Sequence, residues 1–184
     1  FLVAIAIGIA ILWRVNPEIF AARARFQPGT KGWDLSLMPL QIGALVMLPV
    51  VAGLDFRFGW SAVPLPVVLL GHAAFIAGFA GMTWAQATNR FFEPGVRIQS
   101  DRGHHVVDSG PYSVVRHPGY SSASLLAVGM ALALGSWWAL VPALVAIAAL
   151  VYRTGREETT LRAELAGYTE YTGRVRHRWL PGIW

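Results

Sequence analysis

The sequence has no cysteine among its 184 residues, which excludes a disulfide framework, a thiolate zinc site and a cysteine nucleophile. Charge is also scarce, because charged residues make up 14% of the chain against roughly 25% in a typical soluble domain. Hydrophobic residues make up 55%, so we expect a chain solvated mostly by lipid. The formal net charge of +5 comes from short basic segments beside apolar runs, and we therefore exclude a nucleic-acid partner.

Four apolar segments predict the membrane-spanning helices: Phe1–Val15, Leu35–Leu54, Val63–Ala85 and Tyr120–Tyr152. As one helix the last segment would be about 50 Å long, whereas the hydrocarbon core of a bilayer is about 30 Å thick. Its middle, Gly135–Trp138, combines residues that loosen a helix with two tryptophans, which favour the membrane interface. We therefore predict an all-α polytopic membrane protein with about five transmembrane helices, the last two forming a short helical hairpin.

The first apolar segment could also be the hydrophobic region of a signal peptide. No basic residue stands before it in the sequence, and Trp13-Arg14 near its end is typical of a membrane interface. We interpret this segment as a transmembrane helix.

The basic residues predict the orientation. All of them except Arg57 lie in three segments, 14–31, 90–116 and 153–178. Five spans place these three segments on one side of the membrane and Arg57 on the other. Because arginine and lysine favour cytoplasmic loops, we expect the N-terminus outside and the C-terminal helix and tail in the cytoplasm.

Two polar segments on the predicted cytoplasmic side carry residues suited to chemistry: QSDRGHHVVDSGPYSVVRHPGY at 99–120 and YRTGREETTLRAEL at 152–165. Arginine, histidine and tyrosine donors can hold a carboxylate or ribose hydroxyls. The adjacent Glu157 and Glu158 can hold an ammonium group or offset a positive sulfonium. The combination fits a zwitterionic, water-soluble cofactor that meets a lipid-dissolved partner. The alternative is a solvated helix end whose ion pairs contribute little.

Two other kinds of site are not favoured by pattern. The chain has no G-x-G-x-x-G after a strand, which excludes a soluble dinucleotide-binding fold. The spacing of His104, His105 and His117 matches no zinc site, and we predict no metal.

The polar segments resemble the isoprenylcysteine carboxyl methyltransferase and phospholipid methyltransferase superfamily, integral-membrane enzymes that use S-adenosylmethionine. The superfamily pattern has a histidine, G-x-Y and R-H-P-x-Y, here HHVVDSGPYSVVRHPGY at 104–120. A helical hairpin follows, then REETTL at 156–161 and a tyrosine-rich tail, GYTEYTGRVRHRWLPGIW at 167–184. The length of 184 residues predicts a single domain over 1–184, with N-terminal spans in 1–96. The resemblance covers roughly the C-terminal half, from Arg97 onward, and implies a cofactor-binding catalytic half in 97–184.

The resemblance also implies the site residues. Arg116, His117 and Glu158 are expected to be catalytic. The expected S-adenosylmethionine-binding residues are His104, Gly110, Tyr112, Arg116, His117, Tyr120, Glu157 and Glu158. The form of the tail is closer to that of bacterial members, which implies a bacterial inner membrane.

We therefore predict S-adenosylmethionine-dependent methyl transfer, with S-adenosylhomocysteine as product, to a lipophilic acceptor at the cytoplasmic membrane face. A carboxylate acceptor needs no general base, whereas an amine or hydroxyl would need His117 or a glutamate. The acceptor is expected to enter from lipid between the third span and the hairpin. Two alternatives stay open: a membrane reductase that uses NADPH, and a non-enzymatic transporter or accessory protein. A transporter should carry more polar groups within its spans, where His72 and Gln41 are nearly alone.

Overall fold

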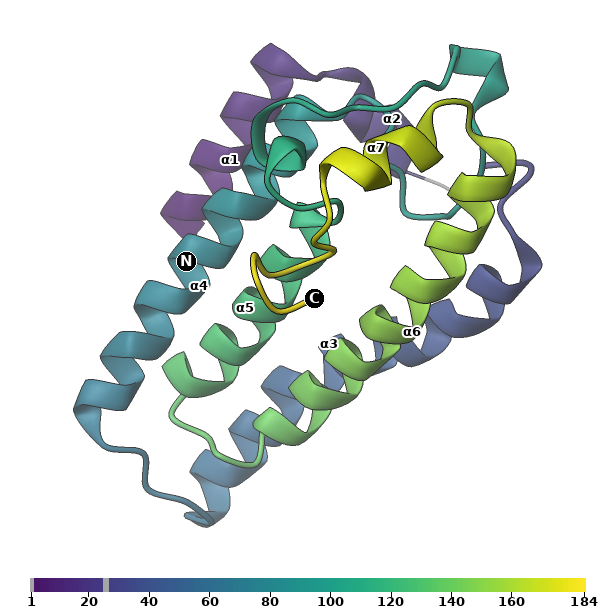
Figure 1. Cartoon of the computed structure of the whole chain (residues 1–184). Helices are drawn as coiled ribbons and strands as arrows, with labels where there is room; N and C mark the ends of the chain where they lie inside the picture. The colour runs from purple at the N-terminus through teal and green to yellow at the C-terminus, as the bar shows by residue number, and fades with distance from the viewer. Residues whose placement is uncertain (1, 25–26) are drawn as a thin grey trace.

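The computed structural model describes residues 2–24 and 27–184. Within these ranges the chain forms helices and no strand, which confirms the all-α prediction. The helices, shown in Figure 1, are α1 (Leu2–Val15), α2 (Glu18–Arg23), α3 (Gly32–Phe58), α4 (Leu65–Thr88), α5 (Pro118–Ala133), α6 (Leu140–Glu164) and α7 (Tyr168–Arg174), with the short 3₁₀ helices η1 (Ser100–Arg102) and η2 (Gly110–Ser113). Phe1 and Arg25, which belong to the predicted first span and first basic segment, lie outside the described residues.

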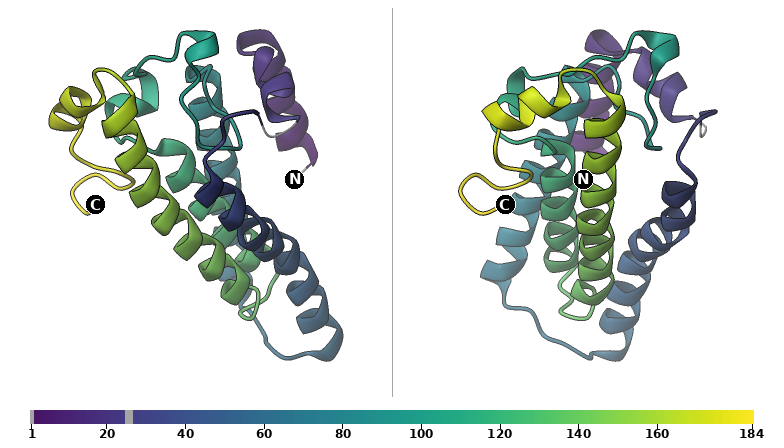
Figure 2. Two further views of the ribbon diagram at one scale, coloured as in Figure 1. Left: turned by 90° about the vertical axis from the view of Figure 1, so that its right-hand side faces the viewer. Right: turned by 45° about the vertical axis from the view of Figure 1, so that its right-hand side comes forward.

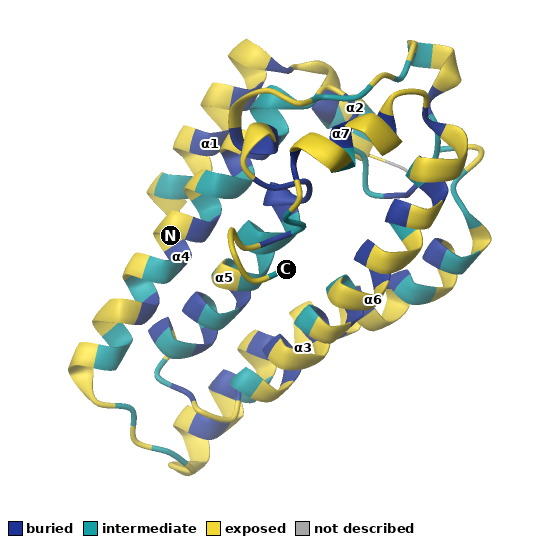
Figure 3. Ribbon diagram, in the orientation of Figure 1, coloured by how far each residue is buried: buried dark blue, intermediate teal, exposed yellow. Residues whose placement is uncertain are grey.

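Two of the described helices, α3 and α4, are long and apolar enough to cross a membrane. At 1.5 Å per residue they are about 40 Å and 36 Å long, which exceeds the hydrocarbon core of about 30 Å. Many residues of both helices are exposed, as the colours of Figure 3 show, and they include large apolar side chains; Phe56 is 89% exposed and Leu65 is 68% exposed. Exposure of such apolar side chains to water costs free energy, whereas their exposure to lipid does not. The count of five spans and the orientation stay predictions.

The break in the long apolar segment lies where the sequence predicts it. Helix α5 ends at Ala133, Gly135 adopts a positive φ of 71°, and α6 begins at Leu140. The Ser136 hydroxyl in this turn donates to the carboxylate of Asp55 on α3, which also accepts from the hydroxyl of Ser61. The hairpin is not made of two short helices, however, because α6 has 25 residues and continues through the polar REETTL segment.

Small residues let α4 and α5 pack in direct contact, which is how helices associate closely in lipid. A Cβ added to Gly78 would lie 2.6 Å from the backbone nitrogen of Leu126 and 2.8 Å from the carbonyl oxygen of Ser122. Figures 1 and 2 show the two helices side by side over most of their length.

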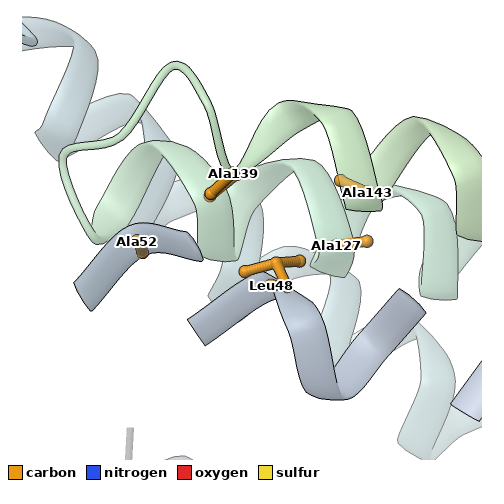
Figure 4. Close-up of a cluster of buried hydrophobic side chains, with 6 residues drawn as sticks. Leu48, Ala52, Ala127, Ala139 and Ala143 are labelled. Atoms are coloured by element: carbon orange, nitrogen blue, oxygen red, sulfur yellow. The ribbon is translucent and has the colours of Figure 1, made fainter. Parts of the chain in front are cut away.

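A second contact joins α3 to the α5–α6 hairpin through a cluster of mostly alanine side chains. Figure 4 shows Leu48 of α3, fully buried, among these alanines. The buried members of the cluster are Leu48, Ala52, Ala127, Ala131, Ala139 and Ala143. Their small volumes bring the three helix backbones close together, which is how helices associate in lipid.

The connecting segments with most of the basic residues meet at one end of the bundle. Figures 1 and 2 show the α1–α3 link, the α4–α5 link and the residues after α6 at this same end. At this end the C-terminal tail contacts both α5 and α6. On the α5 side, the backbone N–H of His117 donates to the Arg178 carbonyl at 2.8 Å. The Trp179 indole N–H donates to Thr154 of α6 at 2.9 Å. We call this the polar end.

The α4–α5 contact should tolerate no side chain at Gly78. Gly78→Ala should lower the free energy of unfolding by about 1–3 kcal/mol, because the added methyl group meets backbone atoms that cannot rotate away. The matched control is Gly53→Ala on α3, where nothing lies within 4 Å of the added Cβ; alanine favours a helix there. Denaturation in detergent measures both, and equal stability of the two variants would contradict the close contact.

Candidate functional site

A cavity of about 470 Å³ begins at the polar end and continues between the helices. Its size is in the range of small-molecule sites. Its polar half is lined by residues of the α4–α5 link, α6 and α7, among them His104, Arg116, Glu157 and Tyr168. Its apolar half is lined by Met38, Ile42 and Leu45 of α3, Ala123 and Ala127 of α5, and Ala146, Ile147 and Leu150 of α6. One cavity can therefore hold a charged ligand and a hydrocarbon chain.

A buried ion pair joins the R-H-P turn to the glutamate pair. The Arg116 Nε donates to the Glu158 Oε1 at 2.5 Å, and both side chains are almost fully buried. The His117 Nε2 lies 3.3 Å from the same oxygen, and the Arg178 Nε donates to the other oxygen at 3.0 Å. Burial alone would raise the pKa of Glu158, but the hydrogen bonds from His117 and Arg116 hold this pKa well below its usual range. Glu158 is therefore an anion at neutral pH.

The tail completes the arrangement around Arg116. Its Nη1 donates to the carbonyl oxygens of Val175 and Arg176, each at 2.7 Å. Arg116 thus ties together the turn before α5, the middle of the polar part of α6 and the tail. A guanidinium can do this because it presents five donors in a fixed plane.

Glu157 lies next to Glu158 in sequence but faces a different environment. Its carboxylate lines the cavity and accepts a hydrogen bond from the Tyr120 hydroxyl at 2.6 Å. The nearest histidine nitrogen, Nδ1 of His117, is 3.9 Å away. The His117 ring stacks on the Tyr120 ring with 5.4 Å between centroids. Glu157 is therefore free to bind a positively charged or hydroxyl-bearing ligand.

His104 enters the cavity as a neutral hydrogen-bond donor. The backbone N–H of Gln99 donates to its Nδ1 at 3.3 Å, which assigns the remaining proton to Nε2. Burial lowers the pKa of His104 to about 4. At neutral pH the ring can therefore donate from Nε2 but cannot act as a cation.

The predicted site residues divide into two groups. Six of the eight line the cavity: His104, Tyr112, Arg116, His117, Tyr120 and Glu157. Glu158 is not among the lining residues and is bound to Arg116, which lines the cavity. Gly110 also lies outside the lining, in the first turn of η2 with a positive φ of 55°. Because Gly110 also packs beside Thr88 on α4, we interpret it as a structural residue that allows the turn into η2.

Sequence reasoning missed a second buried ion pair at the cavity. Arg153 of α6 lines the cavity and its Nε lies 2.9 Å from the Oδ1 of Asp34 on α3. Arg153 also donates to the Pro94 carbonyl, and Asp34 accepts from the backbone N–H of Val96. The sequence does contain a signal for this pair, because Asp34 directly precedes the apolar segment Leu35–Leu54 and Arg153 directly follows the apolar segment Tyr120–Tyr152.

Tyr168 of α7 was missed as an individual residue, although the tyrosine-rich tail was noted. It is 5% exposed and lines the cavity, and its hydroxyl interacts with the Arg116 guanidinium. Tyr168 therefore places a buried hydroxyl at the cavity wall, where a ligand can also reach it.

A comparison with models of protein families identifies the family of this chain. The model of the phospholipid methyltransferase family matches residues 67–166, more than half of the chain. The chain belongs to this family. Membership confirms the resemblance to the isoprenylcysteine carboxyl methyltransferase and phospholipid methyltransferase superfamily. No curated protein matches the chain.

The phospholipid methyltransferase match covers most of α4, the link to α5, and both helices of the hairpin. It therefore includes Arg116, Glu157 and Glu158 but neither α3 nor α7. Membership indicates a membrane-associated methyltransferase with lipid-like substrates. It favours this function over the reductase and the transporter that the sequence left open.

The buried cluster around Glu158 should dominate the stability of the polar end. Glu158→Gln leaves the Arg116 guanidinium buried without its anion, so the free energy of unfolding should fall by about 3 kcal/mol. The control is Glu164→Gln, whose exposed pair with Lys31 should contribute less than about 1 kcal/mol. Denaturation in detergent measures both changes.

The pH dependence follows from the same carboxylate. The pKa of Glu158 is lower in the folded state than in the unfolded state, where it is about 4.3. Ionised Glu158 therefore stabilises the fold fully above this unfolded-state pKa, and the stabilisation is lost as the pH falls through the lower folded-state pKa. The difference between the wild type and Glu158→Gln should hold from pH 7 to about pH 5 and shrink below about pH 4. A difference that disappears near pH 6 would contradict the assigned ionisation.

Proposed function

We propose that the protein transfers a methyl group from S-adenosylmethionine to the polar head of a membrane lipid. The observation that carries this proposal is the single cavity, which joins a charged half at the polar end to an apolar half between α3 and the hairpin. When bound, S-adenosylmethionine would supply a methyl group on a positively charged sulfur.

The residues of the polar half fit the cofactor. Glu157 offers a carboxylate to ribose hydroxyls or to a positive charge. His104 and Tyr168 offer an N–H and a buried hydroxyl at the cavity wall. Phe91 and Phe92 supply apolar surface for a base. Three segments, the α4–α5 link, α6 and α7, would thus meet on one small molecule.

In this proposal Glu158 is a positioning residue. Because three donors occupy its two oxygens, it holds Arg116 and His117 in place and does not contact the reacting groups. Glu157 takes the ligand-contacting role. For an amine acceptor, Glu157 is also the carboxylate able to take up the proton that the ammonium must lose before methylation.

The acceptor lies between α3 and the hairpin in this proposal. The route between α4 and the hairpin, which the sequence analysis expected, is closed by the contact of Gly78 with Leu126 and Ser122. Alanines on α5 and α6 instead leave room facing α3. Exclusion of water by these apolar walls would favour methyl transfer over side reactions.

The orientation and location remain part of the proposal. The cavity opens at the polar end, where most of the basic residues lie, so the positive-inside rule puts the site and the C-terminus in the cytoplasm. We infer the inner membrane of a bacterium.

Ligand-induced stabilisation tests the cofactor. In detergent, S-adenosylhomocysteine at about 100 times its Kd should stabilise the protein by about 2.7 kcal/mol, whereas NADPH should leave it unchanged. Glu157→Gln should lose most of this stabilisation, and Glu170→Gln, an exposed α7 residue outside the cavity lining, should keep it. Stabilisation by NADPH alone would support the reductase, and stabilisation by neither would overturn the proposal.

Identifying the acceptor requires a transfer assay. Protein incubated with methyl-labelled S-adenosylmethionine and a total lipid extract should move label into the lipid phase, and Glu157→Gln should reduce this transfer at least tenfold. Label found only in water-soluble products would contradict a lipid acceptor.

A further inference from the structure

One polar side chain stands alone in the apolar half of the cavity. Gln41 of α3 is 9% exposed and lines the cavity, and its Nε2 has no hydrogen-bond partner among the described residues. An unpaired buried amide costs about 1–3 kcal/mol. In a helix that faces lipid, a leucine at this position would avoid that cost. The position therefore points to a ligand that satisfies the amide.

The depth of Gln41 sets where such a ligand group must be. Gln41 lies seven residues after Asp34, about 10 Å further along α3. Asp34 pairs with Arg153, whose guanidinium lies over the Tyr120 ring at 5.7 Å, so Asp34 marks the level of the polar half. The amide of Gln41 thus lies about 10 Å further along α3 than the polar half of the cavity, where the proposed function puts methyl transfer.

The described residues that surround Gln41 in this half of the cavity are apolar. Met38 and Leu45, three residues before and four residues after Gln41, share its face of α3, and Ile42 also lines this half of the cavity. The facing helices contribute alanine, isoleucine and leucine side chains to the same half. The Gln41 amide is therefore an isolated donor in an apolar half-cavity.

Gln41 lies outside the family match, which begins at residue 67. The cofactor residues proposed from Arg116 to Glu157 lie inside it. Helix α3, like α7, lines the cavity from outside the matched residues, and in the proposed function α3 faces the acceptor.

We propose that Gln41 is a specificity-determining residue that donates its Nε2–H to an ester carbonyl oxygen of a diacyl lipid acceptor. Such an oxygen lies deeper in the bilayer than the head group that would be methylated. A saturated or isoprenoid chain carries no oxygen at this depth and would leave the amide unpaired. This inference rests on the proposed function and adds to it the part of the acceptor that is recognised.

The test compares ester-linked and ether-linked lipids with the same head group and chain length. The ether lipids lack the carbonyl oxygen. Phosphatidylethanolamine and phosphatidylserine, each in both forms, would be presented in nanodiscs to the wild type and to Gln41→Met, which keeps the length of the side chain and removes the donor. The control is Thr83→Val, which removes a buried polar group of α4 that lies outside the cavity lining and bonds to its own helix.

The wild type should prefer the ester form about tenfold in kcat/KM. Gln41→Met should lose this preference through a higher KM for the ester form, with little change for the ether form. Thr83→Val should keep it. Because the Gln41 amide is unpaired without lipid, Gln41→Met should also raise the Tm of the lipid-free protein. A lower Tm would show that the amide has a structural partner and would overturn the inference.

The outcomes separate this inference from the proposed function. Stabilisation by S-adenosylhomocysteine together with equal use of ester and ether lipids overturns the role of Gln41 alone. Stabilisation by S-adenosylhomocysteine without methylation of any of the four lipids also overturns the role of Gln41. Absence of both stabilisation and methylation overturns the proposed function.

Discussion

The buried pair of Arg116 and Glu158 is the interaction on which the polar end depends. The two residues are 42 positions apart in the chain and meet at 2.5 Å with almost no exposure. Arg116 also binds two carbonyl groups of the tail, and Glu158 also accepts from His117 and Arg178. Each charge is thus satisfied by several partners, which is the condition under which a buried ion pair is tolerated. The turn before α5, the end of α6 and the tail are fixed relative to one another by this cluster.

The cluster also separates the tasks of two neighbouring glutamates. Adjacent residues on a helix point about 100° apart, so Glu157 turns toward the cavity while Glu158 turns toward Arg116. The fixed pair holds the wall of the cavity, and the other carboxylate stays available to a ligand. The second buried pair, Asp34 with Arg153, attaches α3 to α6 at the same level. The apolar half of the cavity continues from there between α3 and the hairpin, so the two pairs define both the charged half and the way toward lipid.

The sequence predicted the parts of this structure that leave a local signal. Gly135–Trp138 marked the hairpin turn, and the apolar segments marked the long helices α3 and α4. The meeting of the R-H-P turn with the glutamate pair came from the family resemblance, since no local pattern connects residues so far apart. The pattern also gave no reason to separate Glu157 from Glu158, because the distinction arises from where the tail and Arg116 lie. Asp34 and Arg153 are 119 positions apart in different helices, and their pairing depends on helix packing. Gln41 was recognised as polar within a span, but only the structure shows that it lines the cavity.

An experimentally determined structure of the protein with S-adenosylhomocysteine tests the central claim most directly. The account predicts the nucleoside in the polar half of the cavity, in contact with Glu157 and Tyr168, while Arg116 and Glu158 keep their pair and the space beside α3 stays open to a lipid chain. A nucleoside bound elsewhere, or one that contacts Glu158 after the Arg116 pair has separated, would contradict it.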